Sequence, residues 1–181
     1  MNSLLSFLGK HDFRQSFIGM VIPFFFLLLY TFFTTLYDSI PDQTLRFFFH
    51  NHFVILCVKL IHLISSSTDV IAIQNSMIAN HVNLEIVRTC DGSTTFFLLV
   101  SAILVFRAPL KLTIMGLIVS LLLIMSLNVL RIVSLYFLII YDYAWFSYFH
   151  HSIAPFLLLS VSCGYFAFWA YYVKEVKHER S

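Results

Sequence analysis

The sequence predicts an all-α, polytopic membrane protein with about four transmembrane helices, an interfacial helix and a short β-hairpin on the outer face. Of its 181 residues, 60% are hydrophobic and only 11% are charged, and the mean hydropathy is +0.88. Soluble domains contain about 45–50% apolar and about 25% charged residues, so this composition indicates a lipid environment. The length fits one membrane-embedded domain, residues 1–181, because four to six spans of about 20 residues would occupy most of it.

Charge and cysteine content exclude other classes of protein. The formal net charge is only +2, and no basic block interleaved with aromatic residues appears, so we expect no nucleic-acid partner. Three widely spaced cysteines, Cys57, Cys90 and Cys163, fit neither a disulfide framework nor a zinc site. Cys57 and Cys163 lie in apolar runs, where cysteine usually acts as a small hydrophobe. Cys90 alone is flanked by polar residues.

The first apolar run, residues 17–36, is long enough to cross a bilayer. No cleavage site of small residues follows a short apolar core here, so we interpret the run as a permanent anchor rather than a removed signal peptide. Lys10 and Arg14 precede it, and the positive-inside rule therefore places the N-terminus in the cytoplasm.

The next two segments differ from the spans. Residues 44–64 combine apolar side chains with Arg46 and three histidines, a mixture that suits a helix lying in the membrane interface better than a full crossing. Apolar and polar residues alternate within residues 69–88, and Asn80-His81 offers a turn. We therefore predict a β-hairpin there.

Three further spans are predicted at residues 92–107, 112–140 and 152–173. Basic residues mark two cytoplasmic ends, one in the loop after the first of these spans and one after the last. These basic residues are Arg107, Lys111, Lys174, Lys177 and Arg180. Both chain termini are therefore expected in the cytoplasm.

Counting crossings from these basic ends places three reactive side chains on the outer face. The span that ends at Arg107 begins just after Cys90, and the last span begins just after His150. The middle helix has risen about 30 Å, at about 1.5 Å per residue, when it reaches Arg131. An odd number of crossings then separates the N-terminus from Cys90, so the interfacial helix should not cross; a crossing there stays the open alternative.

Cys90, Arg131 and His150 suggest acyl-transfer chemistry. A thiol is mostly protonated at neutral pH and becomes a nucleophile when a cation or a histidine base favours the thiolate. Arginine inside an apolar run costs about 2.5–3.5 kcal/mol at mid-membrane, so Arg131 is expected to have a function. We predict Cys90 as nucleophile, Arg131 as electrostatic stabiliser and His150 as acid–base residue. Alternatively, Arg131 could reach lipid headgroups, the histidines could be interfacial polar residues, and Cys90 could merely flank a helix cap.

These residues also resemble a known family. The segments VRTCDGSTTFFLL, LNVLRI and YFHHSIAPF are similar to the core of the exosortase/archaeosortase family of integral-membrane, sortase-like cysteine transpeptidases. In that family, a cysteine followed by a small residue and Gly, or by Asp-Gly, precedes an Asn-x-x-Arg motif and then a histidine before the last span. The matching residues here are Cys90, Asp91, Gly92, Asn128, Arg131 and His150. The resemblance covers about residues 69–165 and implies a compact member without a fused domain.

Asp91 departs from the commoner family pattern, in which Ser or Thr follows the cysteine. An anion beside the thiol disfavours the thiolate of Cys90, so activation should depend more on Arg131 and, in addition, on Arg88. Asn128 lies on the same helical face as Arg131 and is expected to orient the guanidinium or the substrate backbone.

The paired histidines leave the third catalytic residue open. We favour His150 over His151, because Phe-His followed by Pro155 resembles the spacing in some family members. We expect no metal and no other cofactor. The predicted supporting residues are Arg88, Gly92, Asn128 and His151.

The resemblance implies a function and a set of partners. Such enzymes cleave the C-terminal sorting signal of exported proteins, a short motif followed by a transmembrane helix and a basic tail, through an acyl-enzyme at the outer face of the inner (plasma) membrane. The expected partners are those exported proteins, membrane lipid and an acceptor nucleophile that the sequence does not identify; hydrolysis by water stays open. Two alternatives are a non-catalytic membrane scaffold or transporter subunit, and a membrane protein that binds a metal or haem through histidines.

Overall fold

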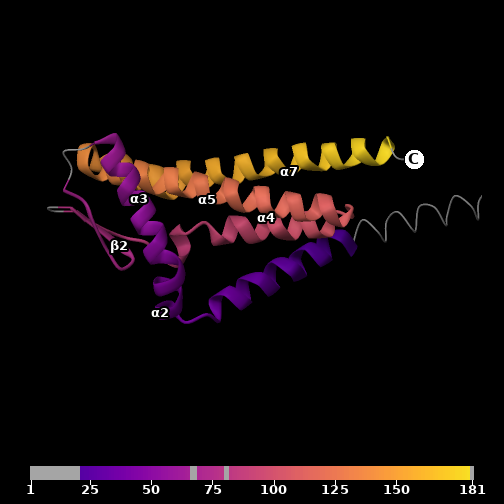
Figure 1. Ribbon diagram of the computed structural model, residues 1–181, viewed down its shortest axis with the longest axis horizontal. Coiled ribbons are helices and arrows are strands. Elements are labelled where there is room, and N and C mark those ends of the chain that lie inside the picture. The colour runs from indigo at the N-terminus through magenta and orange to yellow at the C-terminus, as the bar shows by residue number, and fades with distance from the viewer. Residues whose placement is uncertain (1–20, 66–68, 80–81, 180–181) are drawn as a thin grey trace, which may run out of the picture.

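The computed structural model describes residues 21–65, 69–79 and 82–179. Figure 1 shows long helices running side by side along one axis, with a small β-sheet and a transverse helix gathered at one end. The described elements, in chain order, are a helix over Val21–Asp38, α2 (Asp42–Leu45), a π-helical turn (Arg46–His50), α3 (Asn51–Ile64), β1 (Ile71–Ile73), β2 (Ser76–Ala79), β3 (Val82–Glu85), a 3-10 turn (Arg88–Cys90), α4 (Ser93–Val105), α5 (Leu110–Tyr141), α6 (Tyr143–Tyr148), a second π-helical turn (Phe149–Ile153) and α7 (Ala154–His178).

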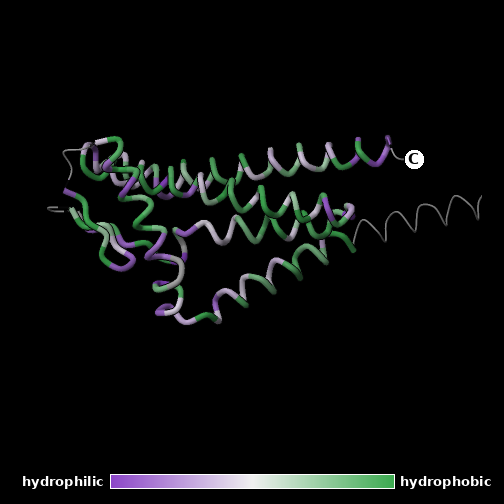
Figure 2. Tube along the Cα trace, viewed as in Figure 1, coloured by the Kyte–Doolittle hydropathy of each residue, from purple (hydrophilic) through white to green (hydrophobic). Residues whose placement is uncertain are grey.

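Within the described ranges, three helices are long and apolar enough to cross a membrane. They are Val21–Asp38, Leu110–Tyr141 and the continuous helical stretch Tyr143–His178. Figure 2 shows hydrophobic residues along most of their length, as expected for surfaces that face lipid. The prediction of an all-α polytopic membrane protein with a short β element is therefore confirmed. The residues predicted as a span at 92–107 form α4, a shorter apolar helix of 13 residues.

The segment predicted as a hairpin at residues 69–88 forms a three-stranded antiparallel sheet in the order β1-β2-β3. A two-residue connection, Gln74-Asn75, joins β1 to β2, and Gln74 adopts a positive φ of 54° there. The extra strand was not expected, because this connection lacks the Asn-Gly or Asp-Gly pair that usually announces a tight hairpin. The predicted turn at Asn80-His81 lies outside the described residues.

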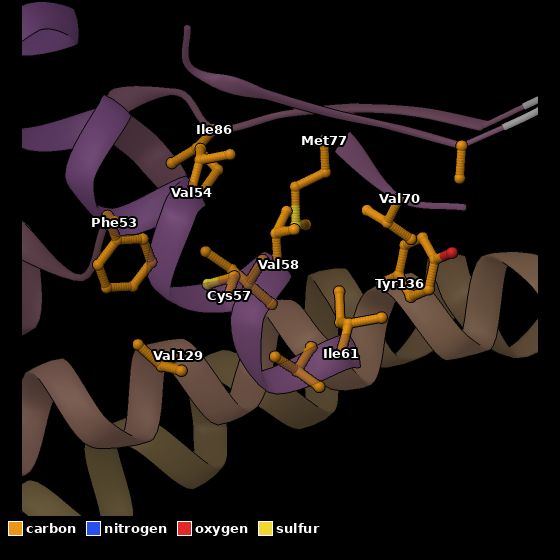
Figure 3. Close-up of a cluster of buried hydrophobic side chains, with 13 residues drawn as sticks. Phe53, Val54, Cys57, Val58, Ile61, Val70, Met77, Ile86, Val129 and Tyr136 are labelled. Atoms are coloured by element: carbon orange, nitrogen blue, oxygen red, sulfur yellow. The ribbon is translucent and has the colours of Figure 1, made fainter. Parts of the chain in front are cut away.

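The sheet packs on a core that it shares with α3 and α5. Figure 3 shows Cys57 and Ile61 of α3 beside Met77 of β2 and Tyr136 of α5, and all four side chains are buried. Figure 1 shows α3 crossing the direction of α5 and α7 instead of running beside them. This core holds the sheet against the end of the bundle, so that β3 lies next to α5.

A second core joins α4, α5 and α7 further along the bundle. Its buried members include Leu99, Ile124 and Trp169. Gly116 of α5 permits the close approach of α7, because a Cβ atom there would lie 2.5 Å from Trp169 Nε1. The Trp169 indole also donates a hydrogen bond to the Leu112 carbonyl at 3.2 Å. The helices that carry the predicted site residues are thus fixed relative to one another.

Candidate active site

Cys90 lies at the sharp turn between β3 and α4. Its backbone N–H donates to the Val87 carbonyl at 2.8 Å, which closes the 3-10 turn that carries the thiol. Gly92 follows with φ at 79°, in the left-handed region that favours glycine. A Cβ at Gly92 would also lie 3.3 Å from Asn128 Cγ. Gly92 therefore allows the chain both to turn into α4 and to approach α5 closely.

The predicted acid–base residue lies beside the predicted nucleophile. The distance between Cys90 Sγ and His150 Nε2 is 3.8 Å, although the two residues are 60 positions apart. His150 belongs to the π-helical turn before α7, and its ring stacks in parallel on Phe146 with a centroid distance of 5.8 Å. Its Nδ1 is buried and makes no hydrogen bond to a described residue.

Of the two adjacent histidines, His150 contacts the thiol. The imidazole of His151 is exposed, and its Nδ1 donates a hydrogen bond to the Ser147 carbonyl at 2.9 Å. The two rings pack edge to face with centroids 4.7 Å apart. His151 is therefore placed to support the orientation of His150.

Asn128 and Arg131 lie about one turn apart on α5, and both are buried. Asn128 Nδ2 donates to the Cys90 carbonyl at 3.0 Å, so this amide holds the main chain of Cys90. Arg131 is only 9% exposed, and its Nε has no hydrogen-bond partner among the described residues. Buried polar atoms are normally paired, so the unpaired Nε of Arg131 calls for an explanation.

The hydrogen bonds of the Arg88 guanidinium go to residues of the preceding helices and their connection. Its Nε donates to Asp42 Oδ1 at 2.7 Å, and its terminal nitrogens donate to the carbonyls of Tyr37 and Ile40. Its charge also lies 5.4 Å from the centre of the Tyr37 ring. These contacts clamp the turn before Cys90 to the end of the Val21–Asp38 helix, and the hydrogen bond from Arg88 lowers the pKa of the Asp42 carboxyl.

Asp91 is buried and has partners that the sequence did not reveal. Its carboxylate accepts hydrogen bonds from the Tyr37 hydroxyl and the Ser93 backbone N–H, and its Oδ2 lies 3.4 Å from His50 Nε2. Burial raises the pKa of Asp91, but the hydrogen bonds from His50, Tyr37 and Ser93 outweigh it and hold the pKa below its usual range. The anion next to Cys90 is therefore stabilised by hydrogen-bonding groups on its other side.

A cavity of about 360 Å³ opens beside Cys90 and His150. One wall is the run of chain from Asn83 to Val87, which contains most of β3. The other wall is mainly apolar and comes from α5 and α6, with Ile132 and Phe146 among its residues. The pair of sulfur and imidazole therefore lies at the border of a space that a polypeptide segment could enter.

Comparison with protein families identified the group to which the chain belongs. The model of the transmembrane exosortase family matches residues 2–168 of the 181. The chain belongs to the transmembrane exosortase family. This membership confirms the resemblance noted in the sequence and supports a membrane transpeptidase role in general. Neither the comparison with curated proteins nor that with solved structures found a match.

The histidines of the chain raised the alternative of a membrane protein that binds a metal or haem. In residues 21–65, 69–79 and 82–179, no group of three His, Cys, Asp or Glu side chains is arranged to hold a metal ion. Two of the histidines, His50 and His150, contact Asp91 and Cys90. In this exosortase-family chain, both histidines therefore contact residues at the turn that carries Cys90.

Proposed function

We propose that this chain is a membrane cysteine peptidase and transpeptidase that cleaves the C-terminal sorting signal of exported proteins. The observation that carries the proposal is the 3.8 Å separation between Cys90 Sγ and His150 Nε2 at the border of a cavity. Catalytic hydrogen bonds are often long before substrate binds and shorten in the complex, so this distance is compatible with proton transfer.

The proposed reaction has two acyl-transfer steps. His150 accepts the thiol proton, and the Cys90 sulfur attacks the carbonyl carbon of the scissile peptide bond. When the C–N bond breaks, the His150 imidazolium gives its proton to the leaving amine, and the acyl group remains on Cys90 as a thioester. An acceptor amine or water then attacks the thioester and gives its proton to His150, which returns it to the sulfur.

Arg131 is proposed to stabilise the oxyanion that forms in each step. Its burial and its unpaired Nε support this role, because a preorganised donor in a water-poor site is most effective where negative charge develops. The guanidinium keeps its charge at every relevant pH and offers donors in a planar fork. Asn128 would act on the same turn by holding the Cys90 carbonyl.

The proposed topology places both termini in the cytoplasm and the site at the outer face of the inner membrane, with residues 44–64 in the interface. The side chain of Lys177 donates to the Arg107 carbonyl, so the two basic segments lie together. Figure 1 shows the end of α7 far from the sheet and α3. The positive-inside rule applied to that basic end supports an outer position for the opposite end.

A comparison of exported proteins in host cells tests this function. Cells that carry Cys90→Ala at matched membrane expression should accumulate a set of exported proteins that retain their C-terminal helix and basic tail, as measured by mass spectrometry. Cys163→Ala is the matched control, since Cys163 is exposed on α7 away from the site, and it should process these proteins normally. Normal processing by Cys90→Ala would favour a non-catalytic scaffold.

A further inference from the structure

The outer edge of β3 carries main-chain groups that no described strand uses. The Ile86 N–H donates to the Asn75 carbonyl at 2.8 Å, which fixes Ile86 as a residue whose main-chain groups face β2. Along an antiparallel strand such residues alternate with residues whose main-chain groups face away. Leu84 therefore faces β2, whereas Asn83 and Glu85 direct their N–H and carbonyl groups to the outer edge. In the described sheet, β3 is the terminal strand on that side.

This edge borders the cavity that contains the candidate catalytic pair. Residues 83–87 line this cavity together with Cys90 and His150. Across from the strand stand apolar side chains of α5, including Ile132, Leu135 and Ile139. Unpaired strand groups beside an apolar wall are costly to leave without hydrogen bonds, and an extended polypeptide is the ligand that supplies matching donors and acceptors.

We propose that the substrate polypeptide binds as an additional β-strand along the outer edge of β3, so that its scissile bond reaches Cys90. Main-chain hydrogen bonds to Asn83 and Glu85 would provide affinity independent of sequence. Because side chains alternate along a strand, every second substrate residue would face the α5 wall and should be apolar. The inference rests on the proposed function and specifies its substrate as an extended peptide with apolar residues at alternate positions.

A peptide probe tests this mode without knowledge of the natural substrate. Acetyl-Ala-Ala-Ala vinyl sulfone carries a terminal alkene to which the Cys90 sulfur adds, while the neighbouring carbon takes up a proton, so no leaving group is required. The readout is the labelling rate of the full chain in detergent, measured by intact-protein mass spectrometry in a Cys163→Ala background. We expect the tripeptide probe to label Cys90 faster than acetyl-Ala vinyl sulfone, which cannot pair along the strand.

Methylation of single amide nitrogens gives the diagnostic pattern. In a paired strand, alternate N–H groups face the partner. Either methylation at the first and third alanines should slow labelling while methylation at the middle alanine does not, or the reverse pattern should appear. Loss of one hydrogen bond should slow labelling about fivefold or more. Equal rates for all methylated analogues, or no advantage of the tripeptide over the single-residue probe, would overturn the strand site.

A pair of edge prolines tests the same inference on the protein side. Asn83→Pro removes one outward N–H without removing a β2 hydrogen bond, and it should slow the tripeptide probe while iodoacetamide alkylates Cys90 at the wild-type rate. Ala72→Pro is the matched control. The main-chain groups of Ala72 face away from β2 on the far side of the sheet, because its neighbours Ile71 and Ile73 pair with Ile78 and Ser76 around the two-residue connection.

The outcomes separate this inference from the proposed function. If Asn83→Pro and Ala72→Pro label equally fast with the tripeptide probe, the strand site is wrong, while Cys90 as nucleophile stands. If Cys90 reacts with neither iodoacetamide nor any vinyl sulfone, the proposed function fails and this inference fails with it. Should Asn83→Pro lose its fold, shown by altered iodoacetamide reactivity, the methylation series on the unchanged protein still decides.

Discussion

The side-chain amide of Asn128 donates a hydrogen bond to the main-chain carbonyl of Cys90 across 3.0 Å and so ties α5 to the turn that presents the thiol. Asn128 is fully buried, and its contact lies about one helical turn from Arg131. The Asn-x-x-Arg spacing therefore places a positioning group and a charged group on one face of α5. Asn128 thus holds Cys90 through its backbone, while the sulfur lies 3.8 Å from His150 Nε2.

Replacement of Asn128 should weaken processing by misplacing Cys90. Asn128→Ala leaves the buried Cys90 carbonyl without its donor, a change that costs about 1–3 kcal/mol. Substrate cleavage in membranes should fall by about tenfold or more at matched expression. Ser126→Ala, at an exposed position of the same helix, should cleave normally. Wild-type cleavage and thermal stability in Asn128→Ala would contradict this role.

Replacement of Arg131 distinguishes a catalytic function from a scaffold function. Arg131→Lys keeps the positive charge but loses the planar fork of donors, so the protein should insert normally and cleave poorly. Loss of an oxyanion donor reduces rates by about 10²–10³. Cleavage by Arg131→Lys and Arg131→Ala should be measured at equal membrane levels. Near-normal processing by both variants would mean that Arg131 does not take part in catalysis.

Because of Asp91, the stability of the folded protein should depend on pH in the acidic range. Its pKa in the folded protein lies below the ordinary value of about 3.9. The carboxylate is therefore fully stabilising above that pH, and the contribution is lost as pH falls through the folded-state value. Asp91→Asn weakens a buried network of hydrogen bonds to a carboxylate and should cost about 1.5–3 kcal/mol at pH 7. Thermal unfolding in detergent should show a gap between wild type and Asp91→Asn that narrows toward pH 3.

The matched control for this measurement is Asp69→Asn, since Asp69 is exposed. That variant should unfold like the wild type at both pH values. A gap between wild type and Asp91→Asn that stays constant with pH would show that the carboxylate charge is not what stabilises this turn.

The orientation in the membrane is open to a direct measurement. A reporter fused after Ile64, at the end of α3, should report the outer side, because α3 lies at the same end of the bundle as the sheet. A second reporter fused after Lys177 should report the cytoplasm. A cytoplasmic signal after Ile64 would place α3 across the membrane and put the shared outer face of the site in serious doubt.

Hydropathy and residue chemistry predicted the fold class and drew attention to Asn128 and His150, which contact Cys90 in the structure. Long apolar runs reveal lipid-facing helices without tertiary information, and a thiol or guanidinium in a polar segment of such a chain is chemically conspicuous. The partners of Asp91 could not be predicted in this way. Tyr37 and His50 lie 54 and 41 positions from Asp91, and no periodic pattern links residues at such separations.

The contacts of the Arg88 guanidinium also could not be predicted from the neighbouring sequence. Its sequence position beside Cys90 suggested that it stabilises the thiolate, but its guanidinium is occupied by Asp42 and by two main-chain carbonyls. A side chain of that length reaches several neighbours, and only the packed arrangement of helices decides among them. The turn at Gln74-Asn75, which divides the first half of the predicted hairpin into β1 and β2, was also missed, because it carries no glycine.

The length of α4 has a consequence for the membrane itself. At about 1.5 Å per residue, its 13 residues rise about 20 Å, whereas the hydrocarbon layer is about 30 Å thick. On the proposed topology, the sulfur of Cys90 therefore lies below the outer plane of the lipid, or the bilayer thins around this side of the protein. On the proposed function, the end of the substrate helix would then have to unwind before Cys90 could reach the scissile peptide bond. Lipid thickness is then expected to affect the rate of the proposed cleavage.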